Sequence, residues 1–167
     1  LNSLNNDFSI ILNQDDKFVE KNISFSKFKS GISSYVTNID LAIKQMKYLM
    51  NSDKNFKQSL KYKKDRERYF YDLWKDMDPT PDTEHNELME EYYRRVSYAN
   101  ENFDGWKEGW ETDRGMIYIL FGPPDQVERT NPSMANSTIY QIWTYNKINK
   151  QFIFKDQNGF GDFRLDS

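Results

Sequence analysis

Four aspartates in turn-rich segments are the clearest candidates for catalytic residues in this chain. They are Asp113, Asp125, Asp156 and Asp162. Two carboxylates that converge in one cleft with separated pKa values can serve as acid and base in a hydrolytic reaction. A hydrolase built on these aspartates is therefore one hypothesis, and it requires that at least two of them face the same solvent-filled pocket.

The single histidine, His85, lies in segment 82–87 together with several carboxylates that could join it in a loose metal site. Helical spacing, however, places Glu84 beside Glu87 and leaves His85 to one side. The chain has no cysteine and no second histidine, and these are the usual ligands of a transition metal. We therefore expect no metal ion and no cofactor, and the missing cysteines exclude thiolate and disulfide chemistry.

Acidic and basic residues follow one another at helical spacing just after this segment. Glu90 and Arg94 are four residues apart, as are Glu91 and Arg95, which predicts two ion pairs on a helix surface. An acid pair beside an anion clamp is the functional alternative. A contact from one arginine to Asp113, or to a carboxylate of the Asp-Pro turn at 78–82, is another.

A basic stretch between 54 and 68 is the main concentration of positive charge. Its members are Lys54, Lys57, Lys61, Lys63, Lys64, Arg66 and Arg68. Such a face can attract anions or lipid headgroups, although a solvated helix surface is the simpler interpretation. The net charge of −3 does not favour nucleic acid as a partner.

Two glycine-rich motifs in segment 109–125 have the composition of backbone devices rather than of catalytic sites. Their residues are Gly109, Trp110, Thr112, Asp113, Arg114, Gly115, Gly122, Pro123, Pro124 and Asp125. We expect the tryptophan to fill the core and Thr112 and Asp113 to accept backbone N–H groups. The glycines would then direct a buried strand over 115–121 from one tight turn into another. The functional alternative makes the motif a possible site, with Asp113 as a base or ligand held between Trp110 and Gly115, but no residue here is assigned a catalytic role.

The hydrophobic pattern predicts an α+β fold in which N-terminal strands are followed by helices and then by further strands. Alternating apolar residues in 1–37 predict an N-terminal β hairpin or arm, which would be the β-rich tail of a preceding domain. Helical spacing predicts about three helices, over 38–50, from 53 to about 77, and over 83–103. Strands over 115–121, 138–145, 151–156 and 160–165 would form a small antiparallel β meander packed on the helices, so that 38–167 forms one region.

Aromatic side chains must supply much of the core, because they make up 16% of the residues while hydrophobic residues reach only 37%. Large aromatic rings bury enough area to stabilise a chain of 167 residues despite its polar average. No stretch approaches 18 consecutive apolar residues, so we expect no transmembrane segment. The chain begins at Leu1 and reads as a piece of a longer protein.

Residues from about Phe70 onward resemble the GWxTD domain, which is named for the pentad found here at 109–113. Further matching segments are 74–81, 86–87, 91–96, 98–100, Phe103, 122–125, 142–143, 152–154, Asp156 and 159–165. Met77 departs from the family pattern, which more often has a basic residue at that point. So many segments in order over the last part of the chain make the resemblance specific.

The resemblance implies a bacterial cell-envelope protein, in the periplasm or associated with the outer membrane, of a kind common in Bacteroidota. It implies no particular reaction, so no catalytic residue is carried over. Our leading hypothesis is a non-catalytic structural or protein-interaction module of unknown activity. Its partner would be another envelope protein or the remainder of its own full-length chain.

Overall fold

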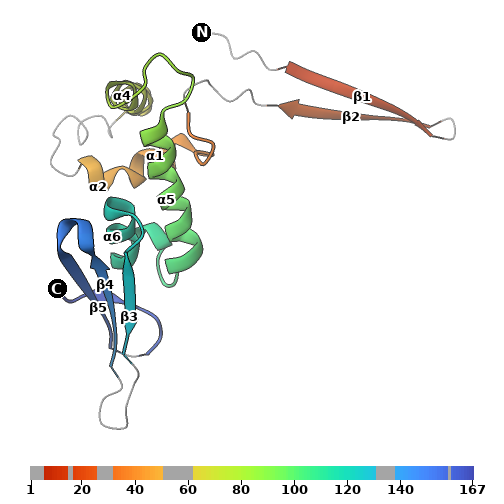
Figure 1. Cartoon of the computed structure of the whole chain (residues 1–167). Coiled ribbons are helices and arrows are strands. Elements are labelled where there is room, and N and C mark those ends of the chain that lie inside the picture. Colours follow the sequence, from red (N-terminus) through yellow and green to blue (C-terminus); the bar gives the residue numbers. More distant parts are fainter. Residues whose placement is uncertain (1–5, 15–16, 26–31, 51–61, 131–137, 158) are drawn as a thin grey trace.

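The computed structural model describes residues 6–14, 17–25, 32–50, 62–130, 138–157 and 159–167. Within these ranges the chain is α+β, with a two-stranded sheet, a set of helices and a four-stranded antiparallel sheet (Figure 1). The elements in chain order are β1 (Asn6–Gln14), β2 (Lys17–Phe25), α1 (Ile39–Gln45), α2 (Lys47–Met50), α4 (Lys63–Asp76), α5 (Glu87–Phe103), η1 (Gly109–Glu111), α6 (Asp113–Phe121), β3 (Gln126–Arg129), β4 (Ile139–Tyr145), η2 (Asn146–Ile148), β5 (Lys150–Asp156) and β6 (Arg164–Leu165).

β1 and β2 form an antiparallel hairpin whose register runs from Asn6 opposite Phe25 to Gln14 opposite Lys17. Figure 1 shows this hairpin apart from the helices and from the second sheet. Two strands alone are marginal in water. The assignment of residues 1–37 to a preceding domain therefore stays a prediction.

The helices are more numerous than the three that the pattern predicts. The first predicted helix, over 38–50, is divided into α1 and α2 at Met46, whose backbone N–H bonds the carbonyls of Ala42 and Ile43. Asn38 caps α1 by accepting from the backbone N–H of Leu41. Among the helices of the described residues, none is long and apolar enough to cross a bilayer.

Segment 115–121 is a helix, α6, so the prediction of a strand there is wrong. Thr112 begins α6 as its N-cap, and Gly122 ends it with a φ of 79°. The prediction failed because α6 lies between two cores: Ile119 packs with the helices, whereas Ile117 and Tyr118 pack with the sheet. Residues 116–121 form a continuous apolar run that includes the exposed Leu120 and Phe121, and periodicity alone does not distinguish such a run from a buried strand.

The C-terminal sheet is an antiparallel meander in the order β3-β4-β5-β6. β4 and β5 correspond to the strands predicted over 138–145 and 151–156, and β6 is shorter than the strand predicted over 160–165. The first strand of the meander is β3, where a strand over 115–121 was predicted. Trp143 lies opposite Phe152 in the β4–β5 register. Trp143 and Phe154 are buried against Tyr118 of α6, so the sheet packs on the helical layer.

Candidate functional site

The Gly-Trp pair of the pentad fixes η1 tightly against α5. A Cβ on Gly109 would overlap the backbone carbonyl of Ala99, so only glycine fits there. Trp110 is 5% exposed and packs in the same core as Val96 and Ala99, as the sequence predicts. Its backbone N–H donates to Asn100 Oδ1 at 2.9 Å.

Thr112, Asp113 and Gly115 connect η1 to α6 and to the last strand. Thr112 Oγ1 accepts from the backbone N–H of Gly115 at 3.0 Å and donates to the Gly109 carbonyl at 2.8 Å. A Cβ on Gly115 would overlap that same Gly109 carbonyl. Asp113 Oδ2 accepts from the backbone N–H of Leu165 at 2.7 Å. The pentad thus joins α5, α6 and β6.

The second motif ends α6 and starts the sheet. The Arg95 guanidinium donates to the Ile119 carbonyl at 3.1 Å and would contact a Cβ on Gly122 at 3.3 Å. The Tyr145 hydroxyl donates to the Gly122 carbonyl at 2.8 Å. Asp125, which follows Pro123 and Pro124, accepts from a backbone N–H at the start of η2 at 2.6 Å. Every polar contact here serves a helix end or a turn.

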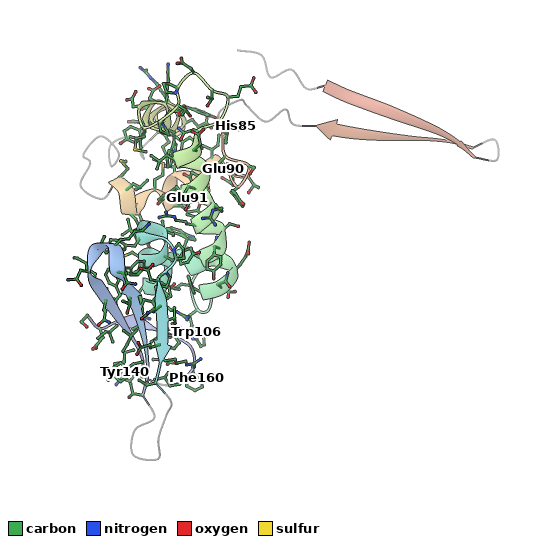
Figure 2. All side chains as sticks on the ribbon, viewed as in Figure 1. His85, Glu90, Glu91, Trp106, Tyr140 and Phe160 are labelled. Atoms are coloured by element: carbon green, nitrogen blue, oxygen red, sulfur yellow. The ribbon has the colours of Figure 1, made fainter. Side chains whose placement is uncertain are left out.

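A cleft opens beside the first turn of α6 and has a volume of about 200 Å³. One wall is the loop that follows α5 and carries Trp106, and the other is the loop between β5 and β6 that carries Phe160. Trp106 is 91% exposed and Phe160 is 83% exposed. Figure 2 places both residues at the same end of the molecule.

Hydrogen bonds shape the described parts of both loops, although the rings at their tips are solvated. Asp156, which is 1% exposed, accepts from the backbone N–H groups of Gly159 and Gly161 at 2.9 and 2.8 Å. These two glycines have φ values of 75° and 86°, a conformation that favours glycine. On the other wall, the N–H of Gly105 donates to the Lys107 carbonyl at 3.1 Å. Two large apolar rings are therefore exposed on turns that backbone N–H groups help to close.

A second hollow, of about 540 Å³, adjoins the cleft. The two share Trp106, Phe160, Asp162 and Arg164 among their lining residues. These four side chains therefore border both hollows.

Arg114 lines the cleft as a half-buried cation. Its guanidinium lies over the rings of Phe103 and Phe163, at 5.2 and 4.4 Å from the ring centroids. Burial lowers its pKa, as does Arg129, while nearby carboxylates act in the opposite direction. Its hydrogen bonds, to Gln141 Oε1 and the Gly161 carbonyl, are long at 3.4 Å each.

The four aspartates of the hydrolase hypothesis are partly brought together. Asp113 and Asp162 line the same cleft, and Asp162 also lines the second hollow with Asp156. Each carboxylate is engaged within the fold, however. Asp162 pairs with Arg164 at 2.8 Å, and the other three accept backbone N–H groups. Asp125 lines neither hollow.

The acidic and basic residues of α5 form only one of the two predicted pairs. Arg95 Nε donates to Glu91 at 2.7 Å, as predicted. The prediction for Glu90 and Arg94 is wrong, because Arg94 instead bonds Glu91 through two nitrogens, at 2.8 and 2.9 Å. Glu90 accepts from the backbone N–H and the hydroxyl of Ser34, which docks the segment before α1 onto α5.

Burial acts to raise the pKa of Glu90, yet the bonds from the Ser33 and Ser34 side chains and from the Ser34 backbone lower it overall. Burial likewise acts to raise the pKa of Glu91, and the bonds from Arg95 and Arg94 outweigh it. Both carboxylates therefore remain ionised to lower pH than ordinary glutamates.

His85 and the basic stretch do not define a site in the described part of the chain. His85 lines a hollow of about 520 Å³ near Glu90 and Glu91, towards the end of α5 far from Trp106 (Figure 2). No group of metal-binding side chains was found among the described residues. Lys54, Lys57 and Lys61 lie outside the described residues, as do the side chains of Lys63 and Lys64. Arg66 pairs with Asp40 at 2.8 Å and Arg68 with Asp72 at 3.6 Å.

Sequence reasoning missed Trp106 and Phe160, the two residues that dominate the cleft. The signal that could have found them is a large ring beside glycine in a polar turn, as in segments 104–107 and 159–162. Such a ring has few neighbours to bury it.

Comparison with known proteins identifies the family of this chain. Neither the curated proteins nor the solved structures contain a match to the chain. The family model for the GWxTD domain matches residues 10–163 of the 167-residue chain. The match includes the pentad, the second motif and both walls of the cleft, and the chain therefore belongs to the GWxTD domain family.

Proposed function

We propose that this chain is a non-catalytic protein-interaction module of a bacterial cell-envelope protein, and that it binds its partner at the Trp106–Phe160 cleft. The observation that carries the proposal is the exposure of these two rings, which border the same cleft. Contiguous exposed apolar patches commonly mark interaction sites. Tryptophan is also among the residues that most often dominate the binding energy of protein interfaces.

The role of the pentad supports the same proposal. Its glycines and its tryptophan fix η1 to α5, and its aspartate bonds β6, so it aligns the two loops that form the walls of the cleft. This role is structural and does not require the motif to catalyse a reaction. The envelope location rests on the usual setting of the family that the chain belongs to, and it is part of the proposal.

Site-specific photocrosslinking in cells tests this proposal. A photoreactive residue is placed at Lys107, beside the exposed tryptophan, and as a control at Tyr62, which is 68% exposed at the start of α4. We expect a discrete crosslinked protein from position 107 and none from position 62. The crosslinked protein is then purified, and its affinity is measured directly for the wild type, Trp106→Ala and Tyr62→Ala.

Loss of affinity only in Trp106→Ala supports an interaction at the cleft. Equal affinity for all three proteins contradicts it. Fractionation of the same cells tests the location, since recovery of the protein in the cytoplasmic fraction alone contradicts the envelope assignment.

A hydrolase remains the second proposal, because Asp113 and Asp162 line one cleft. Its test is turnover of chromogenic ester, phosphate and glycoside substrates by the wild type and by Asp113→Asn and Asp162→Asn. Turnover that both variants lose, at wild-type stability, supports this proposal over the first. Turnover that neither substitution affects rules out these two residues as its source.

A further inference from the structure

Arg114 is a cation without an ionic partner in the described part of the chain. The ion pairs among the described residues join other side chains, and the hydrogen bonds of Arg114, at 3.4 Å, are near the limit for such bonds. Its Nε is buried and has no hydrogen-bond partner. Half-buried charges in proteins are normally paired, because removal from water is costly.

The groups around Arg114 do not supply the missing ionic partner. The guanidinium of Arg129 lies 5.7 Å from the Phe163 ring centroid, and Arg114 lies 4.4 Å from the same centroid. Two cations therefore share one ring. The carboxylates near the cleft are already engaged: Asp113 with the Leu165 N–H, Asp156 with two glycine N–H groups, and Asp162 with Arg164.

The geometry points to a carboxylate of the partner as the group that completes Arg114. We infer that the cleft binds an extended segment in which an acidic side chain lies next to an aromatic or large apolar residue. The acidic side chain would approach Arg114, and its neighbour would pack between Trp106 and Phe160. A guanidinium binds a carboxylate through two parallel hydrogen bonds, so it also orients the segment.

The shape of the site favours a side chain over a chain terminus as the source of this carboxylate. Trp106 and Phe160 border both the cleft and the second hollow, so a segment that fills both hollows must continue past the rings. A terminal carboxylate would leave one of the two hollows empty. This inference rests on the proposed interaction at the cleft. The experiment below can contradict the inference while the proposed interaction still stands.

The probes are short peptides with acetylated and amidated ends and a central Phe-Glu pair between glycine and serine residues. A matched peptide carries glutamine in place of glutamate. A third carries glutamine and a free terminal carboxylate, and inorganic phosphate is the fourth probe. Dissociation constants are measured by titration calorimetry against the wild type, Arg114→Gln, Arg114→Lys and the control Arg68→Gln, whose arginine lies on α4.

We expect the glutamate peptide to bind the wild type about 10-fold more tightly than the glutamine peptide, as a charged hydrogen-bonded pair provides. The ratio should fall to about 1 in Arg114→Gln and stay unchanged in Arg68→Gln. Trp106→Ala should weaken both peptides to the same extent, because the ring acts on the apolar residue. Arg114→Lys, which keeps the charge and loses the planar fork, should show an intermediate ratio and serves if Arg114→Gln does not fold.

Equal affinity of the two peptides for the wild type overturns the inference, as does a preference that persists in a folded Arg114→Gln. Tighter binding of the third peptide assigns Arg114 to a terminal carboxylate, and tighter binding of phosphate assigns it to a small anion. Both results overturn the assignment to a side chain. If no peptide binds while the crosslinked partner still depends on Trp106, the inference fails and the proposed function stands.

Discussion

Trp110 and Trp106 are four residues apart and allow the same chemical deletion to be compared in two opposite settings. Trp110 is 5% exposed, and its ring packs in the helical core beside Tyr48, with the Lys47 ammonium 4.6 Å from the ring centroid. Its backbone bonds, to Asn100 and from the Tyr48 hydroxyl, survive substitution by alanine. Trp110→Ala therefore removes the ring alone.

Loss of a buried tryptophan ring costs about 3–5 kcal/mol of unfolding free energy, since both the transfer energy and the cavity contribute. In a chain of this size, that corresponds to a fall in melting temperature of roughly 10 °C. Trp106→Ala should change the unfolding free energy by less than about 0.5 kcal/mol, because the ring is 91% exposed. Urea unfolding followed by circular dichroism measures both variants. A Trp110→Ala protein as stable as the wild type refutes the structural role of the motif, particularly if it has lost partner binding.

Three further predictions concern backbone contacts and pH. Gly115→Val should destabilise the fold by about 3 kcal/mol or more through its clash with backbone, whereas Gly105→Ala, with open space around its Cβ, should be neutral in the same melts. Asp113→Ala should cost about 1–2 kcal/mol and speed hydrogen exchange of the Leu165 amide, while unchanged exchange would contradict the bond between them. The lowered pKa of Glu91 means that its stabilisation is present above the ordinary glutamate pKa and is lost as the pH falls through its folded value. The unfolding free energy of Glu91→Gln should therefore fall less steeply than that of the wild type between about pH 5 and 3, and parallel curves would contradict this.

Much of the helical and strand content follows from local pattern, because those elements have one buried face. α5 shows buried residues at helical spacing, such as Met89, Tyr92 and Val96, and β4 alternates along its core-facing side at Ile139, Trp143 and Tyr145. α6 could not be recognised in this way. Its residues 116–121 are all apolar, the exposed Leu120 and Phe121 included, so it lacks the polar face that distinguishes a helix from a strand.

The cleft could not be derived from the sequence, because it depends on contacts between distant segments. Asp113 bonds Leu165 across 52 positions, and Asp156 fixes the loop that holds Phe160 in solvent. Tryptophan is a residue type that usually lies in the core, so the sequence does not indicate that Trp106 is exposed. Its exposure follows from its position on a turn that packs little against it. The pentad was expected to be a backbone device, but its connection to the walls of the cleft required the tertiary structure.

The affinity of the purified crosslinked partner for the double variant Trp106→Ala/Phe160→Ala tests the account most directly. The account predicts that affinity falls about 100-fold, as the loss of two anchor residues of an interface should cause, while the unfolding free energy stays that of the wild type. Wild-type affinity in a folded double variant would contradict it, and the cleft would then not be the interaction site of this domain.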